Sequence, residues 1–82
     1  MNELIALPAL RPGEGGAVRR MRGPEPLIRR LRDLGLIEGA AVCCLGRSPG
    51  GDPAAYRICG AVLALRDSDC GGILVSRDGG AP

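Results

Sequence analysis

Residues 31–39 read Leu-Arg-Asp-Leu-Gly-Leu-Ile-Glu-Gly, and this stretch is the most informative in the chain because it marks the end of a helix. Leu27, Leu31 and Leu34 are spaced at i, i+4 and i+7, which places their side chains in one apolar stripe along a helix. An acidic residue and two prolines just before the stripe suit a first helical turn. The pattern predicts a helix over about 25–34.

Gly35 supplies the predicted stop of this helix. Glycine takes the left-handed conformation of a helix C′ position without steric cost. A Schellman motif with Gly35 at C′ would bring Leu36, at C″, onto Leu31, at C3. Gly39 then precedes a run of strand-like composition. We therefore expect a short helix inserted between two strands.

The rest of the chain consists of short apolar runs separated by glycine and proline. Strands are expected over 17–21, 41–45, 54–58, 61–65 and 73–76, with a further short strand or turn and a loose helical turn within the first ten residues. Cys59 and Gly60 mark a tight hairpin, and one helical turn over 67–71 is expected to be capped by Asp67 or Ser68. Five or six short strands at this spacing predict a mainly β fold, a small barrel with one inserted α-helix.

The length of 82 residues corresponds to one domain, expected to span 1–76 with a flexible tail over 77–82. Hydrophobic residues make up 45% of the chain but Tyr56 is the only aromatic, so the core must be aliphatic. Alternation along the strands and the helical stripe predict a core of Val18, Leu27, Leu31, Leu34, Leu36, Val42, Cys44, Ile58, Leu63, Leu65, Ile73 and Val75. No signal peptide or transmembrane segment is apparent, so we expect a cytoplasmic protein with reduced thiols.

All the basic residues are arginines, and they are unevenly placed. Between residues 19 and 32, six arginines stand against one glutamate, a local net charge of +5. This cluster suits an acidic protein surface, anionic lipid or nucleic acid, although a solvated helix face has the same composition. Single-strand binders stack bases on aromatic side chains, so we do not expect nucleic acid as the partner. A small nucleic-acid-associated barrel stays as an alternative.

The four cysteines offer a second candidate site. Cys43, Cys59 and Cys70 are weak candidates for a soft metal site, since thiolates suit iron or zinc. The chain has no Cys-x-x-Cys spacing and no histidine, and Cys44 points to the opposite face of its strand from Cys43. We favour a structural reading and expect no cofactor, with a thiol-dependent metal carrier or sensor as an alternative function.

The order of these features resembles the ferrous iron transport protein A family (FeoA). The resemblance is carried by Pro12-Gly13, a strand, a helix ending Leu34-Gly35-Leu36, a strand opening at Gly39, a loop ending Gly51-Asp52-Pro53, the hairpin Arg57-Ile58-Cys59-Gly60, and then Leu63-Ala64-Leu65-Arg66 and Ile73-Leu74-Val75. It covers roughly residues 3–76. The chain departs from the family pattern at Cys43, Cys59 and Cys70, and at Gly46 and Ala54, where bulkier residues are usual.

The resemblance implies an SH3-like barrel and a cytoplasmic accessory role in bacterial ferrous iron uptake. The implied mechanism is docking on the cytosolic part of the FeoB-type ferrous iron transporter, with membrane contact only through that partner. Residues expected to contribute are Arg29, Arg30, Arg32, Leu36, Arg47 and Asp52. A related domain forms the C-terminal part of some repressors of the diphtheria toxin repressor type, but this chain has no helix-turn-helix segment.

Two other activities are not expected. Proline-rich peptide recognition, which the SH3-like fold suggests, needs a groove lined by aromatic residues, and one tyrosine cannot supply it. Asp67 and Asp69 lack a base partner and read as cap and surface residues. The glycine runs follow no phosphate-loop pattern. We therefore expect a protein that is not an enzyme.

Overall fold

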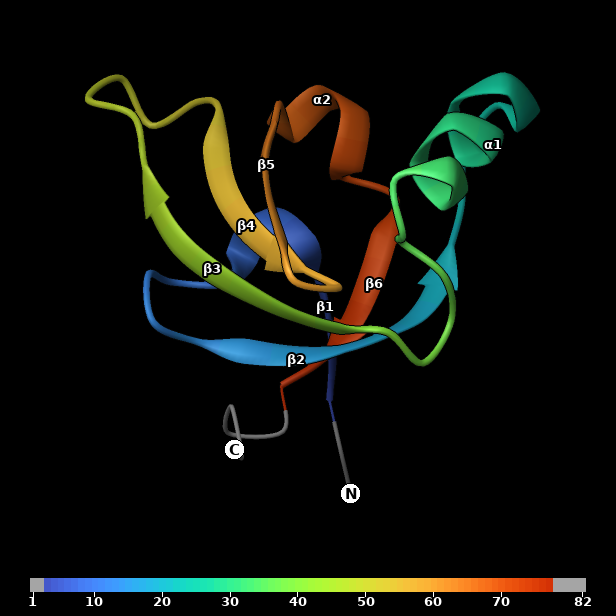
Figure 1. Cartoon of the computed structure of the whole chain (residues 1–82), viewed down its shortest axis with the longest axis horizontal. Helices are drawn as coiled ribbons and strands as arrows, with labels where there is room; N and C mark the ends of the chain where they lie inside the picture. The colour runs from blue at the N-terminus through green and yellow to red at the C-terminus, as the bar shows by residue number, and fades with distance from the viewer. Residues whose placement is uncertain (1–2, 78–82) are drawn as a thin grey trace.

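A six-stranded antiparallel sheet forms the body of the molecule in the computed structural model, which describes residues 3–77. The sheet curls around its core in the order β1-β6-β2-β3-β4-β5 (Figure 1). The strands are β1 (Leu4–Ala6), β2 (Gly15–Met21), β3 (Ala41–Arg47), β4 (Ala54–Ile58), β5 (Ala61–Leu65) and β6 (Ile73–Ser76). The helices are the 3-10 turn η1 (Leu7–Ala9), α1 (Glu25–Asp33) and the single turn α2 (Asp67–Cys70). The expected mainly β architecture with one inserted helix is confirmed.

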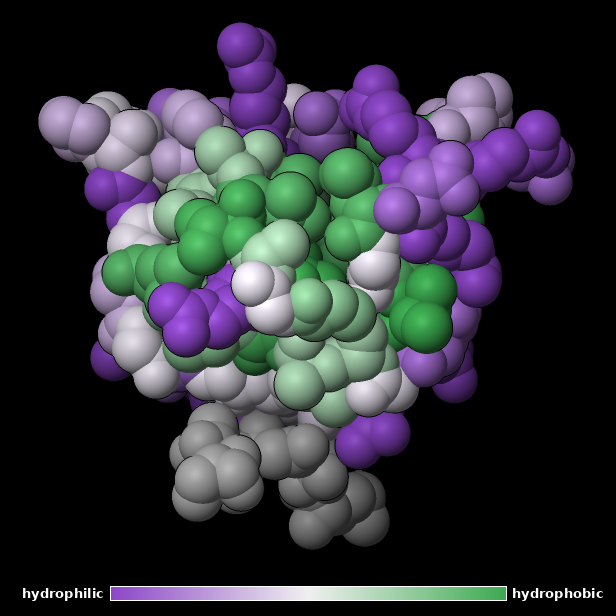
Figure 2. Space-filling view, viewed as in Figure 1, coloured by the Kyte–Doolittle hydropathy of each residue, from purple (hydrophilic) through white to green (hydrophobic). Residues whose placement is uncertain are grey.

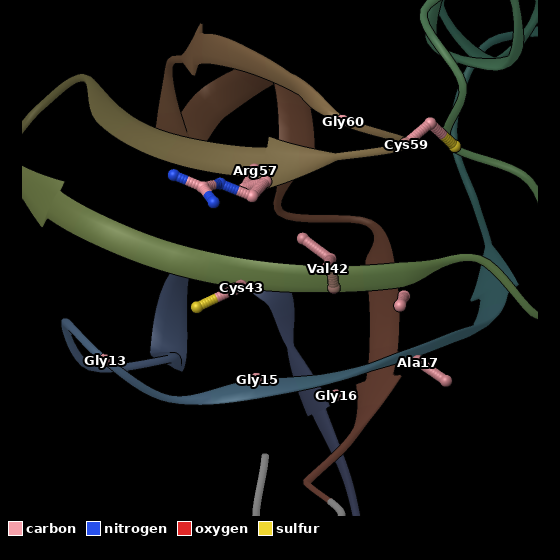
Figure 3. A pocket seen from close by; sticks show the side chains of 10 residues that line it. Gly13, Gly15, Gly16, Ala17, Val42, Cys43, Arg57, Cys59 and Gly60 are labelled. Carbon is pink, nitrogen blue, oxygen red and sulfur yellow. The ribbon is translucent and has the colours of Figure 1, made fainter. Parts of the chain in front are cut away.

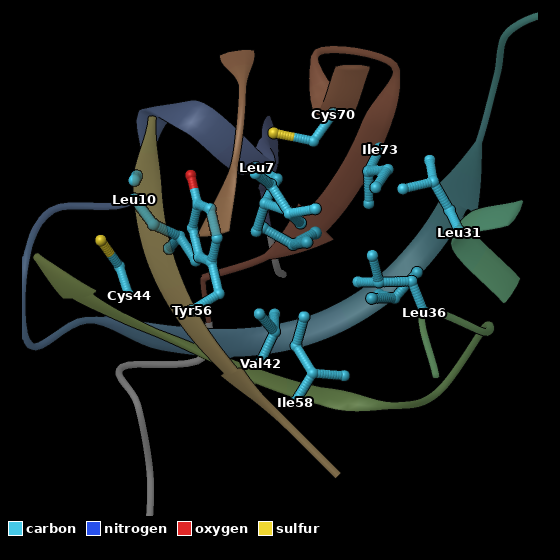
Figure 4. Packing of buried hydrophobic residues seen from close by; sticks show 14 residues of the cluster. Leu7, Leu10, Leu31, Leu36, Val42, Cys44, Tyr56, Ile58, Cys70 and Ile73 are labelled. Atoms are coloured by element: carbon cyan, nitrogen blue, oxygen red, sulfur yellow. The ribbon is translucent and has the colours of Figure 1, made fainter. Parts of the chain in front are cut away.

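The stop of α1 has the predicted Schellman geometry. Gly35 has φ +105°, a conformation that favours glycine. The N–H of Leu36 donates to the carbonyl oxygen of Leu31 at 3.0 Å, and the N–H of Gly35 donates to that of Arg32 at 2.9 Å. Leu31 and Leu36 are both fully buried and lie side by side in the core (Figure 4). The turn therefore joins α1 to the barrel through a buried leucine pair.

The core confirms most of the predicted positions and corrects one of them. Leu34 is 40% exposed, because Leu36 folds back over Leu31 and fills the space at the end of the stripe. Leu27 and Leu63 are only half-buried and pack against the cluster. Five further residues complete the core: Leu7, Leu10, Ala54, Tyr56 and Cys70. The only aromatic ring therefore lies at the centre of an otherwise aliphatic cluster (Figure 4).

Two turns decide how the C-terminal half is arranged. Cys59 (φ +52°) and Gly60 (φ +80°) form the predicted tight hairpin, with the positive dihedrals of a type I′ turn. The cap predicted for 67–71 is wrong: Arg66 is the N-cap residue of α2 and makes no side-chain cap bond. Instead, the carboxylate of Asp52 accepts a hydrogen bond of 2.9 Å from the backbone N–H of Asp67. A loop distant in sequence thus supplies the capping acceptor.

Two strands are longer than predicted. β2 begins at Gly15 and β3 continues to Arg47. Gly15 and Gly16 precede the strand expected over 17–21 but belong to β2, and a Cβ atom at Gly16 would collide with the carbonyl oxygen of Ser76. Glycine is therefore required there for β2 to approach β6 closely. The expected tail over 77–82 lies outside the described residues apart from Arg77, and none of the helices described is long and apolar enough to cross a membrane.

Candidate functional site

The basic face of α1 is the first predicted contact surface. Arg29, Arg30 and Arg32 are exposed. Each has a carboxylate nearby: Arg29 lies 3.8 Å from Glu25, Arg30 lies 3.8 Å from Asp69, and Arg32 lies 3.1 Å from Glu38. The charge that the sequence concentrates in this segment is therefore partly offset by acids from elsewhere. Because these side chains are largely exposed, the ion pairs are weak and open to exchange.

The structure gives internal contacts to the other three expected docking residues, Leu36, Arg47 and Asp52. Leu36 is fully buried, so its side chain cannot contact a partner; the exposed apolar residues at this turn are Leu34 and Ile37. Arg47 donates from Nη1 to the carbonyl oxygen of Gly51 at 2.9 Å and from Nη2 to that of Pro8. It also pairs with the carboxylate of Asp67 at 3.3 Å.

Arg47 and Asp52 together hold the loop between β3 and β4 against η1 and α2. Burial of Arg47 opposes its charge and is the largest single effect, but the hydrogen bond to Asp67 and the surrounding electrostatic interactions together outweigh it and raise the pKa of the guanidinium. The carboxylate of Asp52 accepts a hydrogen bond from the backbone N–H of Asp67. Both side chains are occupied with internal contacts, so they stabilise the fold around α2 and are poorly suited to docking.

The three candidate thiols lie in different environments. Cys70 is fully buried beside the hydroxyl end of Tyr56 (Figure 4), and burial, reinforced by the nearby charge of Asp67, raises its pKa to about 11. Cys59 is exposed in the hairpin turn, and its Sγ lies 3.7 Å from the carbonyl oxygen of Gly35. Within residues 3–77 no group of three His, Cys, Asp or Glu side chains is placed to hold a metal ion.

A shallow hollow lies on the outer face of β2, β3 and β4. Its floor is made of small residues, Gly15 and Ala17 among them, and Cys43 and Arg57 pair across β3 and β4 (Figure 3). The sulfur of Cys59 points away from this hollow in the same view. Arg57 is exposed and makes no ion pair with any carboxylate in the described part of the chain. It is the one charged side chain that lines the hollow.

The exposed apolar residues are the feature that sequence reasoning missed. Val62 is 59% exposed on β5, and Ile37 is 47% exposed after α1. Figure 2 shows an apolar area in the middle of the face that β5 crosses, with hydrophilic side chains over α1. Alternation along 61–65 does place Val62 on the outer face with Arg57, but it does not show that β5 is the last strand of the sheet.

Comparison with known proteins identifies the family. The FeoA domain model matches residues 5–77. The solution structure of an FeoA-like protein from Clostridium acetobutylicum is similar, with 31% identity, a TM-score of 0.83, and coverage of 92% of this chain and 87% of that one. No curated protein sequence matches the chain.

Two further solved structures define the fold. FeoA from Stenotrophomonas maltophilia, solved with zinc, has 27% identity, a TM-score of 0.73, and coverage of 87% of this chain and 88% of that one. That protein is described as a prokaryotic SH3 domain protein proposed to act as a bacterial ferrous iron transport activating factor. A manganese-dependent transcriptional repressor shares the fold alone, at 20% identity and a TM-score of 0.83, with 94% of this chain covering 43% of the repressor. The SH3-like barrel and the match over residues 5–77 together show that this protein belongs to the FeoA family of ferrous iron transport.

Proposed function

We propose that the protein is a cytoplasmic accessory factor of ferrous iron uptake that docks on the cytosolic part of a FeoB-type membrane transporter. The observation that carries this proposal is the family match over residues 5–77. The description of the Stenotrophomonas relative as a transport activating factor supports the same role. A docking protein needs an accessible surface that a partner can bind, and this chain has an exposed charged helix beside an exposed apolar area.

The α1 face is suited to a partner that is acidic. The acids near Arg29 and Arg30 lie 3.8 Å away, beyond hydrogen-bond distance, and the side chains of both arginines are more than half exposed. A partner carboxylate can replace these acids at little cost, because exposed pairs contribute only about 0–1 kcal/mol. The arginine fork then offers two parallel hydrogen bonds to the incoming carboxylate.

The experiment compares two double charge reversals with the same change in net charge. Arg29→Glu with Arg30→Glu alters the α1 face, and Arg20→Glu with Arg22→Glu alters exposed arginines at the end of β2. Binding to the full-length FeoB-type transporter in nanodiscs is measured at low and moderate salt. We expect the α1 variant to keep the circular dichroism and melting midpoint of the wild type, to bind more weakly, and to lose most of the salt dependence.

Three results would count against these proposals. A wild-type protein that does not bind the transporter would contradict the proposed function. A folded α1 variant that binds as well as the wild type would place docking on another face. Binding to an oligonucleotide control but not to the transporter, abolished by the same reversals, would favour the nucleic-acid alternative.

A further inference from the structure

β5 is the last strand of the sheet, and its outer edge pairs with nothing in the described chain. It runs antiparallel to β4, with Ile58 opposite Ala61 and Arg57 opposite Val62. The opposite edge strand, β1, has only three residues, whereas β5 has five. An unpaired strand edge is a template for another strand, because its backbone N–H and C=O groups have no partner.

The hairpin turn determines which backbone groups face outward. A two-residue type I′ loop closes on a hydrogen-bonded pair, here Ile58 and Ala61. Hydrogen-bonded and non-hydrogen-bonded pairs then alternate along the ladder. The next pairs that do not bond to β4 are those of Val62 and Ala64, so the N–H and C=O groups of these two residues point away from the sheet. They present two donors and two acceptors at the spacing of an added strand.

β5 also lacks the usual protection of an edge. Natural edge strands carry lysine, proline, a bulge or an inward-pointing charge that prevents pairing. The segment Ala61–Leu65 is Ala-Val-Leu-Ala-Leu, and its register with β4 is continuous. Val62 is 59% exposed, while Leu65, on the other face, is buried. The strand is therefore firmly seated on one face and open along its free edge.

Two arginines flank β5. Arg57 lies directly across from Val62 on the outer face, and Arg66 follows the last residue of the strand. Neither arginine pairs with an acid among residues 3–77. An occupant with carboxylates at the matching positions would neutralise both. A second copy of β5 would instead place another Arg57 and Arg66, not carboxylates, beside these two arginines.

The β5 edge is also continuous with the end of α1. The tip of the β4–β5 hairpin contacts the helix stop, where Cys59 Sγ lies 3.7 Å from the carbonyl oxygen of Gly35. The exposed Ile37 follows that stop. A segment lying along β5 would therefore run toward the arginine face of α1.

We propose that the outer edge of β5 is the docking site for an extended segment of the partner, which joins the sheet as a further strand. This inference rests on the proposed function, since the partner is the FeoB-type transporter. The recognised segment has apolar residues beside Val62 and Ala64 and at least one acidic residue facing Arg57 or Arg66. Main-chain hydrogen bonds supply the affinity, and the charges select the partner.

The decisive variant is Ala64→Pro, because it removes a backbone N–H that β4 does not use. Proline is tolerated on an edge strand when its missing N–H faces outward. Ala64→Ser keeps the N–H and is the matched control. Binding to the full-length transporter in nanodiscs should fall about tenfold or more for the proline variant and change less than about twofold for the serine variant. Circular dichroism and the melting midpoint verify the fold of each.

A second pair of variants keeps the test valid if proline disturbs the fold. Val62→Lys places a charge on the free edge, and Arg57→Glu reverses the neighbouring charge; Arg20→Glu is the control for net charge. We expect weaker binding for the first two and wild-type binding for the third. Wild-type affinity in folded Ala64→Pro and Val62→Lys variants, while the wild type binds the transporter, would overturn this inference and leave the proposed function intact.

Two other outcomes are distinguishable from that one. If the wild type does not bind the transporter, the proposed function fails and this inference fails with it. If sedimentation shows that the wild type is a dimer and that the Ala64→Pro variant is a monomer, the occupant of the β5 edge is a second copy of this chain. That result overturns the choice of partner.

Discussion

Replacing Gly35 by alanine tests the helix stop on which the helix-to-barrel connection depends. Gly35 has φ +105°, where an L-residue is strained, and its N–H and the next one both bond to the last turn of α1. A Cβ atom built there would lie 3.4 Å from Cys59 Sγ and 3.6 Å from Ile58 Cγ2, which are ordinary contacts. The alanine variant therefore suffers backbone strain but no collision.

The backbone strain is worth about 1–2 kcal/mol. For a domain of this size, 1 kcal/mol lowers the melting midpoint by about 4–8 °C, so we expect a decrease of at least about 4 °C. Gly35→Val should cost more, because its Cγ atoms extend toward Cys59 and Ile58. Thermal unfolding followed by far-ultraviolet circular dichroism measures both.

Gly50→Ala is the matched control for this prediction. Gly50 is exposed, has no positive φ, and a Cβ atom there would meet nothing within 4 Å. Alanine at this position should leave the midpoint unchanged or raise it slightly, since it restricts the unfolded chain. If Gly35→Ala melts at the same temperature as Gly50→Ala, the reasoning about the left-handed stop is wrong.

Two further predictions concern cysteines. Cys59→Asn should raise the melting midpoint by a few degrees, because asparagine tolerates φ +52° at the first position of a type I′ turn better than cysteine; a lower midpoint would contradict this. Burial raises the pKa of Cys70 from 9.0 to about 11, so the unfolded chain loses that proton first and stability falls as pH rises from 9 toward 11, on the order of 2 kcal/mol. Denaturant titrations across this pH range should show the fall in the wild type and a smaller one in Cys70→Ala, where Tyr56, whose pKa burial also raises, still contributes; equal slopes would refute the assignment to Cys70.

Local patterns predicted the elements of this fold correctly. The leucine stripe, the glycine after it and the two-residue hairpin each depend on interactions between residues close in sequence. They can therefore be predicted from the sequence alone. The placement of Tyr56 in the core was missed although it shares a face of β4 with Ile58, because a polar hydroxyl argues against burial in a residue considered alone. The cap of α2 was missed because its acceptor, Asp52, is fifteen residues away.

The contacts of the candidate docking residues could be established only from the tertiary structure. The arginines of α1 form a strongly positive segment along the sequence, but the turn after the helix places Glu38 beside Arg32, and the tertiary fold places Asp69 beside Arg30. Leu36 was expected both in the core and in the docking surface; the stop of α1 turns it into the core, and its side chain is fully buried.

The order of strands in the sheet is the clearest example of a feature that the tertiary structure decides and the sequence pattern does not. The apolar run of 61–65 predicts a strand whose faces alternate, since alternation is a property of the backbone. Whether that strand has one neighbour or two depends on how β1, β6 and β2 close the other side of the sheet. Edge position is therefore a property of topology, and it alone leaves Val62 and Ala64 with backbone groups free to bind another strand.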